Sequence, residues 1–185
     1  MTRPAAEPAT VRLFGADEAR TRVADLSSVL MDCVDGGASV SFMAPLTSER
    51  ADAFWRRVAE GVAAGDRLLL VAEDRPGGEI VGTVQVIFAV PENQPHRADI
   101  AKMLVRRSAR RQGLGARLMR AAEEAAAAAG RTLLVLDTVT GGDAERLYER
   151  MGWTRVGVVP DYALWPGGGF CDTTFFYKHL SADGA

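Results

Sequence analysis

The stretch Arg110–Ala116, which reads RRQGLGA, constrains this chain more than any other. It separates an apolar run typical of a strand from a long alanine-rich segment typical of a helix. The first N–H groups of a helix have no partner within the helix, and the helix dipole adds partial positive charge there. A strand that leads through glycines into a helix is therefore suited to bind an anion. We interpret Arg110–Ala116 as a pyrophosphate-binding turn in which the glycines admit the ligand and the arginines donate hydrogen bonds.

Composition and charge exclude several classes of protein. The 185 residues are 48% hydrophobic and 25% charged, as expected for one globular domain over 11–181 after a loose tail over 1–10. The net charge of -2 predicts no nucleic-acid surface. No apolar run reaches the ~18–20 residues that span a bilayer, so we expect no membrane segment. The first ten residues lack the apolar core of a signal peptide, which predicts a cytoplasmic protein.

The cysteines and histidines give no metal-binding pattern. Cys33 and Cys171 are far apart in the sequence, and neither His96 nor His179 lies at ligand spacing from another Cys or His. We therefore predict two buried thiols rather than a disulfide, and no metal site.

Hydrophobic periodicity predicts alternating helices and strands. Helices are expected over 16–35, 47–65, 112–130 and 143–151, with Thr47 as an N-cap and Gly65 and Gly130 as stops. Strands are expected over 67–73, 80–90, 97–105, 132–136, 153–159 and 173–178. The pattern indicates one α/β domain with mixed strand pairing.

Four stretches follow one another in a distinctive order: Lys102–Val105, Arg110–Gly115, Leu136–Thr138 and Ala144–Trp153. Together they resemble the GNAT superfamily of acyl-CoA-dependent N-acetyltransferases. The resemblance implies a layered α/β fold whose central twisted sheet is mixed and mostly antiparallel. This sheet would be splayed between its fourth and fifth main strands, with helices on both faces.

Further stretches are similar to the tabtoxin resistance protein group within that superfamily. They are Gly36–Val40 with Phe42–Ala44, Arg97–Asp99, Leu136–Thr138, and Thr154–Gly157 with Pro160–Tyr162. Asp99 stands where this group leads us to expect Glu, which shortens the reach of the carboxylate by one methylene.

The resemblance implies acetyl transfer from acetyl-CoA to an amine and assigns residues to the cofactor. Arg110 and Arg111, with the backbone N–H groups of Gln112, Gly113, Leu114, Gly115 and Ala116, would hold the pyrophosphate. The strand segment Met103, Leu104 and Val105 would pair with the pantetheine arm and supply N–H donors to the oxyanion of the tetrahedral intermediate. Thr138 is also assigned to the cofactor site.

The reaction needs a base and benefits from an acid. An amine like that of lysine has a reference pKa of about 10.4, so about one molecule in several thousand is nucleophilic at pH 7. Asp99 and Asp137, close to strand ends, are the candidate bases, acting directly or through water. The departing thiolate has a reference pKa near 8.5, and Tyr148 matches the tyrosine that would protonate it.

The acceptor is the least defined part of the prediction. Acidic residues near the site favour a cationic amine of a small metabolite, toxin or antibiotic, including a β-lactam-type amino compound. Alternatives are acetylation of a protein N-terminus or lysine, and a non-catalytic acyl-CoA sensor. A P-loop is excluded because no Gly-Lys-Ser/Thr follows Gly113, and the sequence does not indicate an oligomeric state. The candidate acceptor-lining residues are Phe42, Met43, Trp55, Tyr162 and Trp165.

Overall fold

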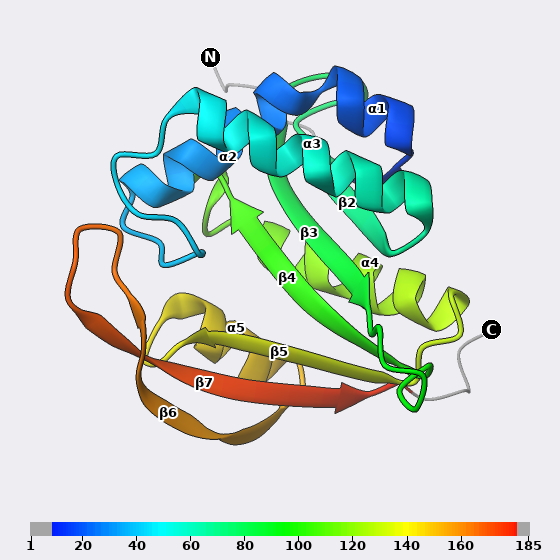
Figure 1. Cartoon of the computed structure of the whole chain (residues 1–185), viewed down its shortest axis with the longest axis vertical. Helices are drawn as coiled ribbons and strands as arrows, with labels where there is room; N and C mark the ends of the chain where they lie inside the picture. Colours follow the sequence, from blue (N-terminus) through cyan, green and yellow to red (C-terminus); the bar gives the residue numbers. More distant parts are fainter. Residues whose placement is uncertain (1–8, 181–185) are drawn as a thin grey trace, which may run out of the picture.

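The computed structural model describes residues 9–180, in which seven strands form one sheet with helices on both faces (Figure 1). The strands are β1 (Thr10–Phe14), β2 (Arg67–Glu73), β3 (Ile80–Phe88), β4 (Arg97–Val105), β5 (Leu133–Val139), β6 (Thr154–Leu164) and β7 (Phe170–His179). The helices are α1 (Ala16–Thr21), α2 (Val23–Asp35), α3 (Ser48–Ala64), α4 (Leu114–Ala128) and α5 (Asp143–Arg150), and Arg107–Ala109 form a 3₁₀ turn, η1.

The sheet is divided between β4 and β5. Its strand order is β1-β2-β3-β4-β5-β7-β6, and every neighbouring pair is antiparallel except β4 with β5. These two parallel strands pair only over Arg97–Asp99 and Leu133–Val135. Beyond that point they diverge, and Figure 1 shows them opening from a common end. The predicted mixed sheet, splayed between its fourth and fifth strands, is confirmed.

Two apolar cores lie on opposite faces of the sheet. Alternate residues of β2 separate them: Leu69 packs beneath α1–α3, whereas Leu70 packs toward α4. Because both faces of β2 and β3 are covered, these strands are apolar at nearly every position. Helix α3 packs on β2, α2 packs on β3 and β4, and α1 packs on α3, whereas α5 lies against β5 on the other face. The α1–α3 side of β5 and β7 is therefore left without a covering helix (Figure 1).

The predicted helix over 16–35 is interrupted at Arg22, which separates α1 from α2. The Arg22 side chain turns inward and forms an ion pair with the fully buried Glu73 at 3.1 Å. Arg12 on β1 pairs with the same carboxylate at 3.0 Å. A buried charge requires such partners. The need to pair Glu73 therefore explains both the interruption of the helix at Arg22 and the docking of β1. The periodicity of the sequence did not predict β1.

The helix expected over 112–130 is two residues shorter at each end. Gly113 has a left-handed backbone (φ 74°), so α4 begins at Leu114, and it ends at Ala128. Leu114, Leu118 and Ala122 are buried as expected, but Ala129 is exposed and lies beyond the helix. By contrast, α3 has the predicted ends: Thr47 accepts a hydrogen bond from Arg50 N, and Gly65 adopts φ 77°.

Cys33 and Cys171 are buried free thiols, as predicted. Among residues 9–180, no three His, Cys, Asp or Glu side chains are grouped to hold a metal ion. None of the helices described within this range is long and apolar enough to cross a membrane. Most of the predicted tail, residues 1–8, lies outside the described residues.

Candidate active site

The turn between β4 and α4 presents a row of backbone donors. Arg111 (φ 61°) and Gly113 (φ 74°) are both left-handed, and this winds the chain around a small concavity. The first hydrogen bond of α4 runs from Arg117 N to Gly113 O at 3.2 Å. Within residues 9–180, no backbone N–H from position 111 to 116 donates to a protein acceptor. Consecutive free N–H groups at a helix start form an anion site.

Gly115 packs closely against residues of α5 and β4. A Cβ added there would be 3.1 Å from Leu147 Cδ2 and 3.7 Å from Met103 Sδ. Gly113 has open space instead, so its requirement for glycine comes from its backbone angle. The two glycines are thus needed for different physical reasons, Gly115 for packing and Gly113 for its left-handed backbone.

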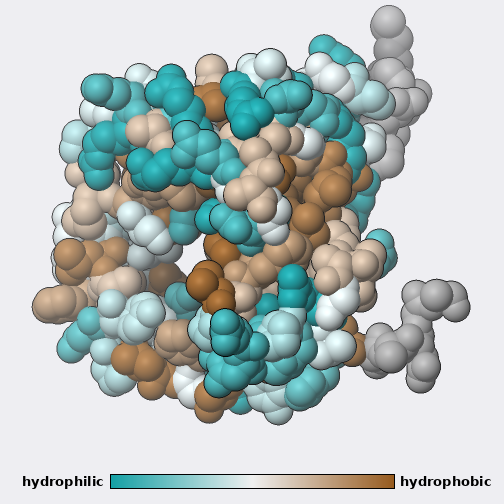
Figure 2. Space-filling model, turned by 45° about the vertical axis from the view of Figure 1, so that its right-hand side comes forward, coloured by the Kyte–Doolittle hydropathy of each residue, from teal (hydrophilic) through white to brown (hydrophobic). Residues whose placement is uncertain are grey.

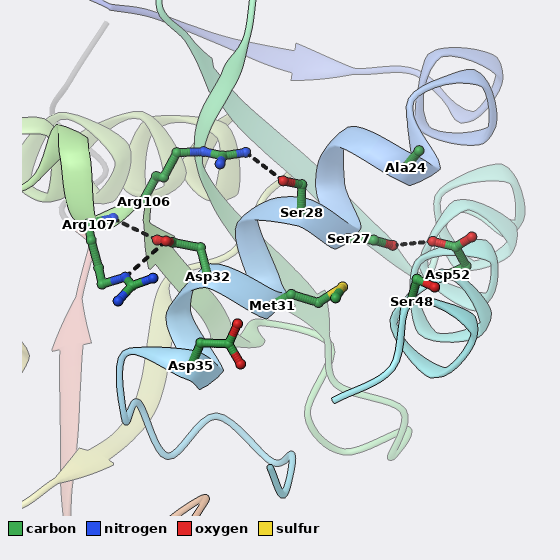
Figure 3. Close-up of a pocket in the computed structure, with 10 residues that line it drawn as sticks. All are labelled: Ala24, Ser27, Ser28, Met31, Asp32, Asp35, Ser48, Asp52, Arg106 and Arg107. Atoms are coloured by element: carbon green, nitrogen blue, oxygen red, sulfur yellow. Dashed lines mark hydrogen bonds and ion pairs between the residues drawn. The ribbon is translucent and has the colours of Figure 1, made fainter. Parts of the chain in front are cut away.

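The four arginines around the turn divide into two pairs. Arg107 is held by Asp32, whose carboxylate accepts from the backbone N at 2.8 Å and from Nε at 2.9 Å. Arg106 donates to Ser28 at 2.9 Å. Figure 3 shows the hydrogen bonds of both arginines at the edge of a pocket of about 510 Å³ between α2 and α3. Arg106 and Arg107 thus anchor η1 to α2. Arg110 is exposed, but its Nε donates to Val105 O at 3.0 Å, so Arg111 and the remaining N–H groups of Arg110 are the arginine donors available to an anion.

Residues Met103–Val105 lie along the free edge of β4. The pairing of β4 with β5 ends at Asp99, so the later residues of β4 have a strand partner only on the β3 side. The register with β3 shifts between Thr83 and Gln85, and Lys102 at this bulge has φ 51°. Leu104 is buried under α2, whereas Met103 and Val105 pack toward α4. Their backbone therefore borders the opening between β4 and β5.

Asp99 and Asp137 lie on the same face of the sheet. Asp99 is paired with Val135, and Asp137 follows two residues later on β5, so both side chains project toward the α1–α3 side. Asp99 is 42% exposed and forms a 2.5 Å ion pair with Arg97. Desolvation by the surrounding protein raises the pKa of Asp137, although water still reaches the side chain; Lys102 opposes this rise and Asp99 adds to it. The surroundings of Asp137 thus favour its protonated form.

Tyr148 approaches the split from the opposite face. It lies on α5 and is 5% exposed, with ring centroids 6.0 Å from both Trp153 and Phe176. Burial raises its pKa above the ordinary value, and the negative charge of Asp137 adds to the effect, so the hydroxyl stays protonated. Thr138 is opposite Thr174 on β7, one position from Asp137. The split is therefore flanked by a carboxylate on one side and a phenol on the other.

Lys102 is a site residue that the sequence analysis did not single out. Its Nζ donates to Ser41 Oγ at 3.1 Å and lies 5.8 Å from the centre of the Phe54 ring, on the side of the sheet that carries the two acids. Burial lowers its pKa, and attraction to Asp137 partly offsets this. The available signal is its position as the one charged residue in the apolar run Ile100–Val105.

The structure separates the five residues that were predicted to line the acceptor pocket. Trp55 was a wrong prediction: it is 0% exposed in the core beneath α3 and cannot line a pocket. Phe42 packs edge-on against Phe54 at 5.3 Å, whereas Met43, Tyr162 and Trp165 are exposed.

The loop before α3 contacts the β6–β7 hairpin across the open end of the split. Ala44 N donates to Pro166 O at 2.9 Å, and Ser39 Oγ donates to Leu164 O at 2.8 Å. Figure 2 shows a hollow near the middle of the molecule, bordered by polar and apolar residues. This bridge bounds the cleft at the end opposite to the β4–β5 pairing.

A model of the acetyltransferase (GNAT) domain matches residues 65–155, from just before β2 into β6. An uncharacterized N-acetyltransferase from the hisH–hisA intergenic region of Azospirillum brasilense is 33% identical over 115 residues, which are 61% of this chain and 66% of that relative. Residues 65–155 are a GNAT acetyltransferase domain. The match supports the predicted assignment of the GNAT protein to the acyltransferases, EC 2.3.1.-.

Solved structures agree with the fold. An N-acetyltransferase from Staphylococcus aureus Mu50 superposes with a TM-score of 0.77 at 17% identity, covering 94% of this chain and 99% of the other. The Salmonella typhimurium protein yncA, solved with its cofactor acetyl-CoA, gives 0.76 at 18% identity and 96% coverage of both chains. A Sinorhizobium meliloti phosphinothricin acetyltransferase in complex with acetyl-CoA gives 0.74 at 16% identity, over 94% and 89%. The similarity to tabtoxin resistance proteins stays a prediction.

Proposed function

We propose that this GNAT protein transfers the acetyl group of acetyl-CoA to the amine of a small molecule. The observation that supports this most strongly is the row of free N–H groups at the start of α4, next to the free edge of β4. These N–H groups are the donors that a pyrophosphate would accept from, and Gly115 keeps them in place by letting the start of α4 pack against Leu147 and Met103. The thioester of acetyl-CoA would then lie in the split, between Asp137 and Tyr148.

The proposed reaction uses groups on both sides of the split. Asp137 accepts a proton from the amine, directly or through water, and the nitrogen attacks the thioester carbonyl. Backbone N–H groups of Met103–Val105 stabilise the oxyanion of the tetrahedral intermediate. The C–S bond then breaks, and the thiolate takes a proton from Tyr148. Asp99 is the alternative base, but its ion pair with Arg97 makes its carboxylate less available.

The reaction is tested by measuring thiol release from acetyl-CoA with a panel of small amines. The panel includes tabtoxinine-β-lactam and phosphinothricin, because sequence resemblance suggested the first and a similar structure is named for the second. We expect turnover above background for at least one small amine. If peptides outcompete every small amine, protein acetylation becomes the better assignment. If acetyl-CoA binds but nothing is acetylated, the sensor reading replaces the enzyme.

Substitution of Gly115 by valine should weaken acetyl-CoA binding selectively. The new side chain meets Leu147 and Met103, so the start of α4 must shift and its N–H groups lose their alignment. We expect the KM for acetyl-CoA to rise about tenfold or more, as for the loss of a charge-assisted contact, with little change in the KM for the amine. Gly15→Val, where a Cβ meets nothing within 4 Å, is the matched control. Equal increases in both KM values would contradict the assignment of this turn.

A further inference from the structure

Two residues with unusual backbone angles meet at the acceptor side of the split. Ser41 has φ 74° and Lys102 has φ 51°, a region that side chains larger than glycine rarely adopt. The Lys102 Nζ–Ser41 Oγ hydrogen bond of 3.1 Å joins them, and the Lys102 carbonyl accepts from Thr83 Oγ1 at 2.9 Å. Such conformations persist where the surroundings enforce them, and they concentrate at functional sites. The bulge in β4 thus holds the Lys102 side chain in one direction.

The ammonium group of Lys102 is not neutralised by a direct ion pair. No carboxylate of residues 9–180 lies within 4.0 Å of its Nζ, and Asp137 acts on it only from a longer distance. An ammonium group has three donors, and Ser41 accepts one of them. Phe54 offers its ring, which attracts a cation weakly but accepts no full hydrogen bond. Two donors therefore remain for a ligand in the cleft.

The cleft has negative charge on one side and positive charge on the other. Asp137 and Asp99 face the region where an amine would enter, and Lys102 stands across from Asp137 between α3 and the split. A ligand with only a positive group would satisfy the acids and be repelled by Lys102. A ligand with an amine and a nearby anion would match both parts at once.

We propose that Lys102, positioned by Ser41, binds an anionic group of the acceptor, so that the acceptors are amino acids or similar amines that carry a carboxylate. This inference rests on the proposed acetyltransferase function and specifies its substrate class. In this arrangement the acceptor amine points toward Asp137 while its carboxylate accepts the two free hydrogens of Lys102. Lys102 is then a specificity-determining residue rather than a participant in proton transfer.

The test uses L-amino acids and their α-carboxamides as matched acceptors. Each pair differs in one negative charge with little change in shape. Wild type, Lys102→Met and Lys102→Arg are compared by kcat/KM at a pH where the rate no longer rises. The ratio of acid to amide is taken for each variant, so the intrinsic nucleophilicity of each amine cancels between variants. Lys178→Met is the matched control, because Lys178 pairs with Glu123 of α4, away from the acceptor side.

We expect wild type to prefer acids, and Lys102→Met to lower the acid-to-amide ratio about 10- to 100-fold, mainly through KM. Lys102→Arg should keep most of the preference, and Lys178→Met should keep all of it. Equal losses for acids and amides would overturn the proposal and indicate a structural role for Lys102. A wild type without preference for acids would overturn it as well.

A second measurement separates this inference from the proposed reaction. Isothermal titration of the same acids and amides into protein saturated with CoA reports binding without turnover. If no acceptor is acetylated, but the acids bind to wild type more tightly than they bind to Lys102→Met, the proposed reaction is contradicted and the anion site is supported. If acetylation proceeds, but acids and amides do not differ in either kcat/KM or affinity, the anion site is contradicted and the proposed reaction is supported. Melting curves of the variants confirm that all are folded.

Discussion

Asp137→Asn should lower kcat by about 10²- to 10⁴-fold, the range typical for loss of a general base. The substitution keeps the size of the side chain but removes its capacity to accept the amine proton. Because burial raises the pKa of Asp137, the wild-type rate should fall as the pH drops through this raised value and the carboxylate becomes protonated. The acid limb of the pH–rate profile should therefore disappear in the variant. Steady-state rates from pH 5 to about 9 measure both effects.

Two further variants make the Asp137 result specific. Asp99→Asn should cost less than Asp137→Asn, because Asp99 is engaged with Arg97. Asp66→Asn, an exposed acid in the turn between α3 and β2, should leave the rate unchanged. If Asp99→Asn has the larger effect and abolishes the acid limb, the two acids exchange their proposed roles. A rate unaffected by either substitution would rule out a carboxylate base in this cleft.

Tyr148→Phe should lower kcat by about 10²-fold, at the lower end of the range for general acids. The thiolate is a good leaving group, so its protonation helps the reaction without being indispensable. The raised pKa of Tyr148 keeps the phenol protonated at neutral pH, in the form that can donate. Affinity for acetyl-CoA, measured by calorimetry, should change little.

The same variant should leave the fold intact. The Tyr148 ring packs on Trp153 and Phe176. Phenylalanine preserves that packing, so the melting temperature should be nearly that of wild type. Tyr148→Ala should instead destabilise the protein by roughly 3–5 kcal/mol, because it leaves a cavity. A kcat of Tyr148→Phe equal to wild type would remove Tyr148 from the reaction.

Much of the fold could be predicted because many helices, strands and turns are marked by residues within the element itself. The Gly113–Gly115 turn, the alanine-rich helix and the strand Arg97–Val105 each carry their own pattern of glycines or periodicity. The break at Arg22 could not be predicted in this way, since it depends on Glu73, 51 positions later. The same applies to β1, because its five residues form a strand only by pairing with β2, which lies far away in the sequence.

The candidate site was predicted unevenly for a similar reason. The turn, the two acids and Tyr148 lie in sequence stretches that resemble GNAT proteins in order and spacing. Lys102 reaches its place only through a β-bulge and a loop 61 positions earlier, so no local pattern reveals it. Trp55 was assigned to the acceptor side because an aromatic residue on a helix has the same pattern whether it faces a pocket or the core. Roles of all these residues stay predictions until the variants are measured.

The contact between the loop before α3 and the β6–β7 hairpin changes what the split can admit. Ser39–Leu164 and Ala44–Pro166 join the two halves at one end, and the β4–β5 pairing joins them at the other. The opening between β4 and β5 is thus closed at both ends. We expect a closed opening to accept a compact molecule or the tip of an extended chain more readily than a folded surface, in line with the proposed small acceptor. Substitutions that break these two hydrogen bonds should therefore widen the range of acceptors.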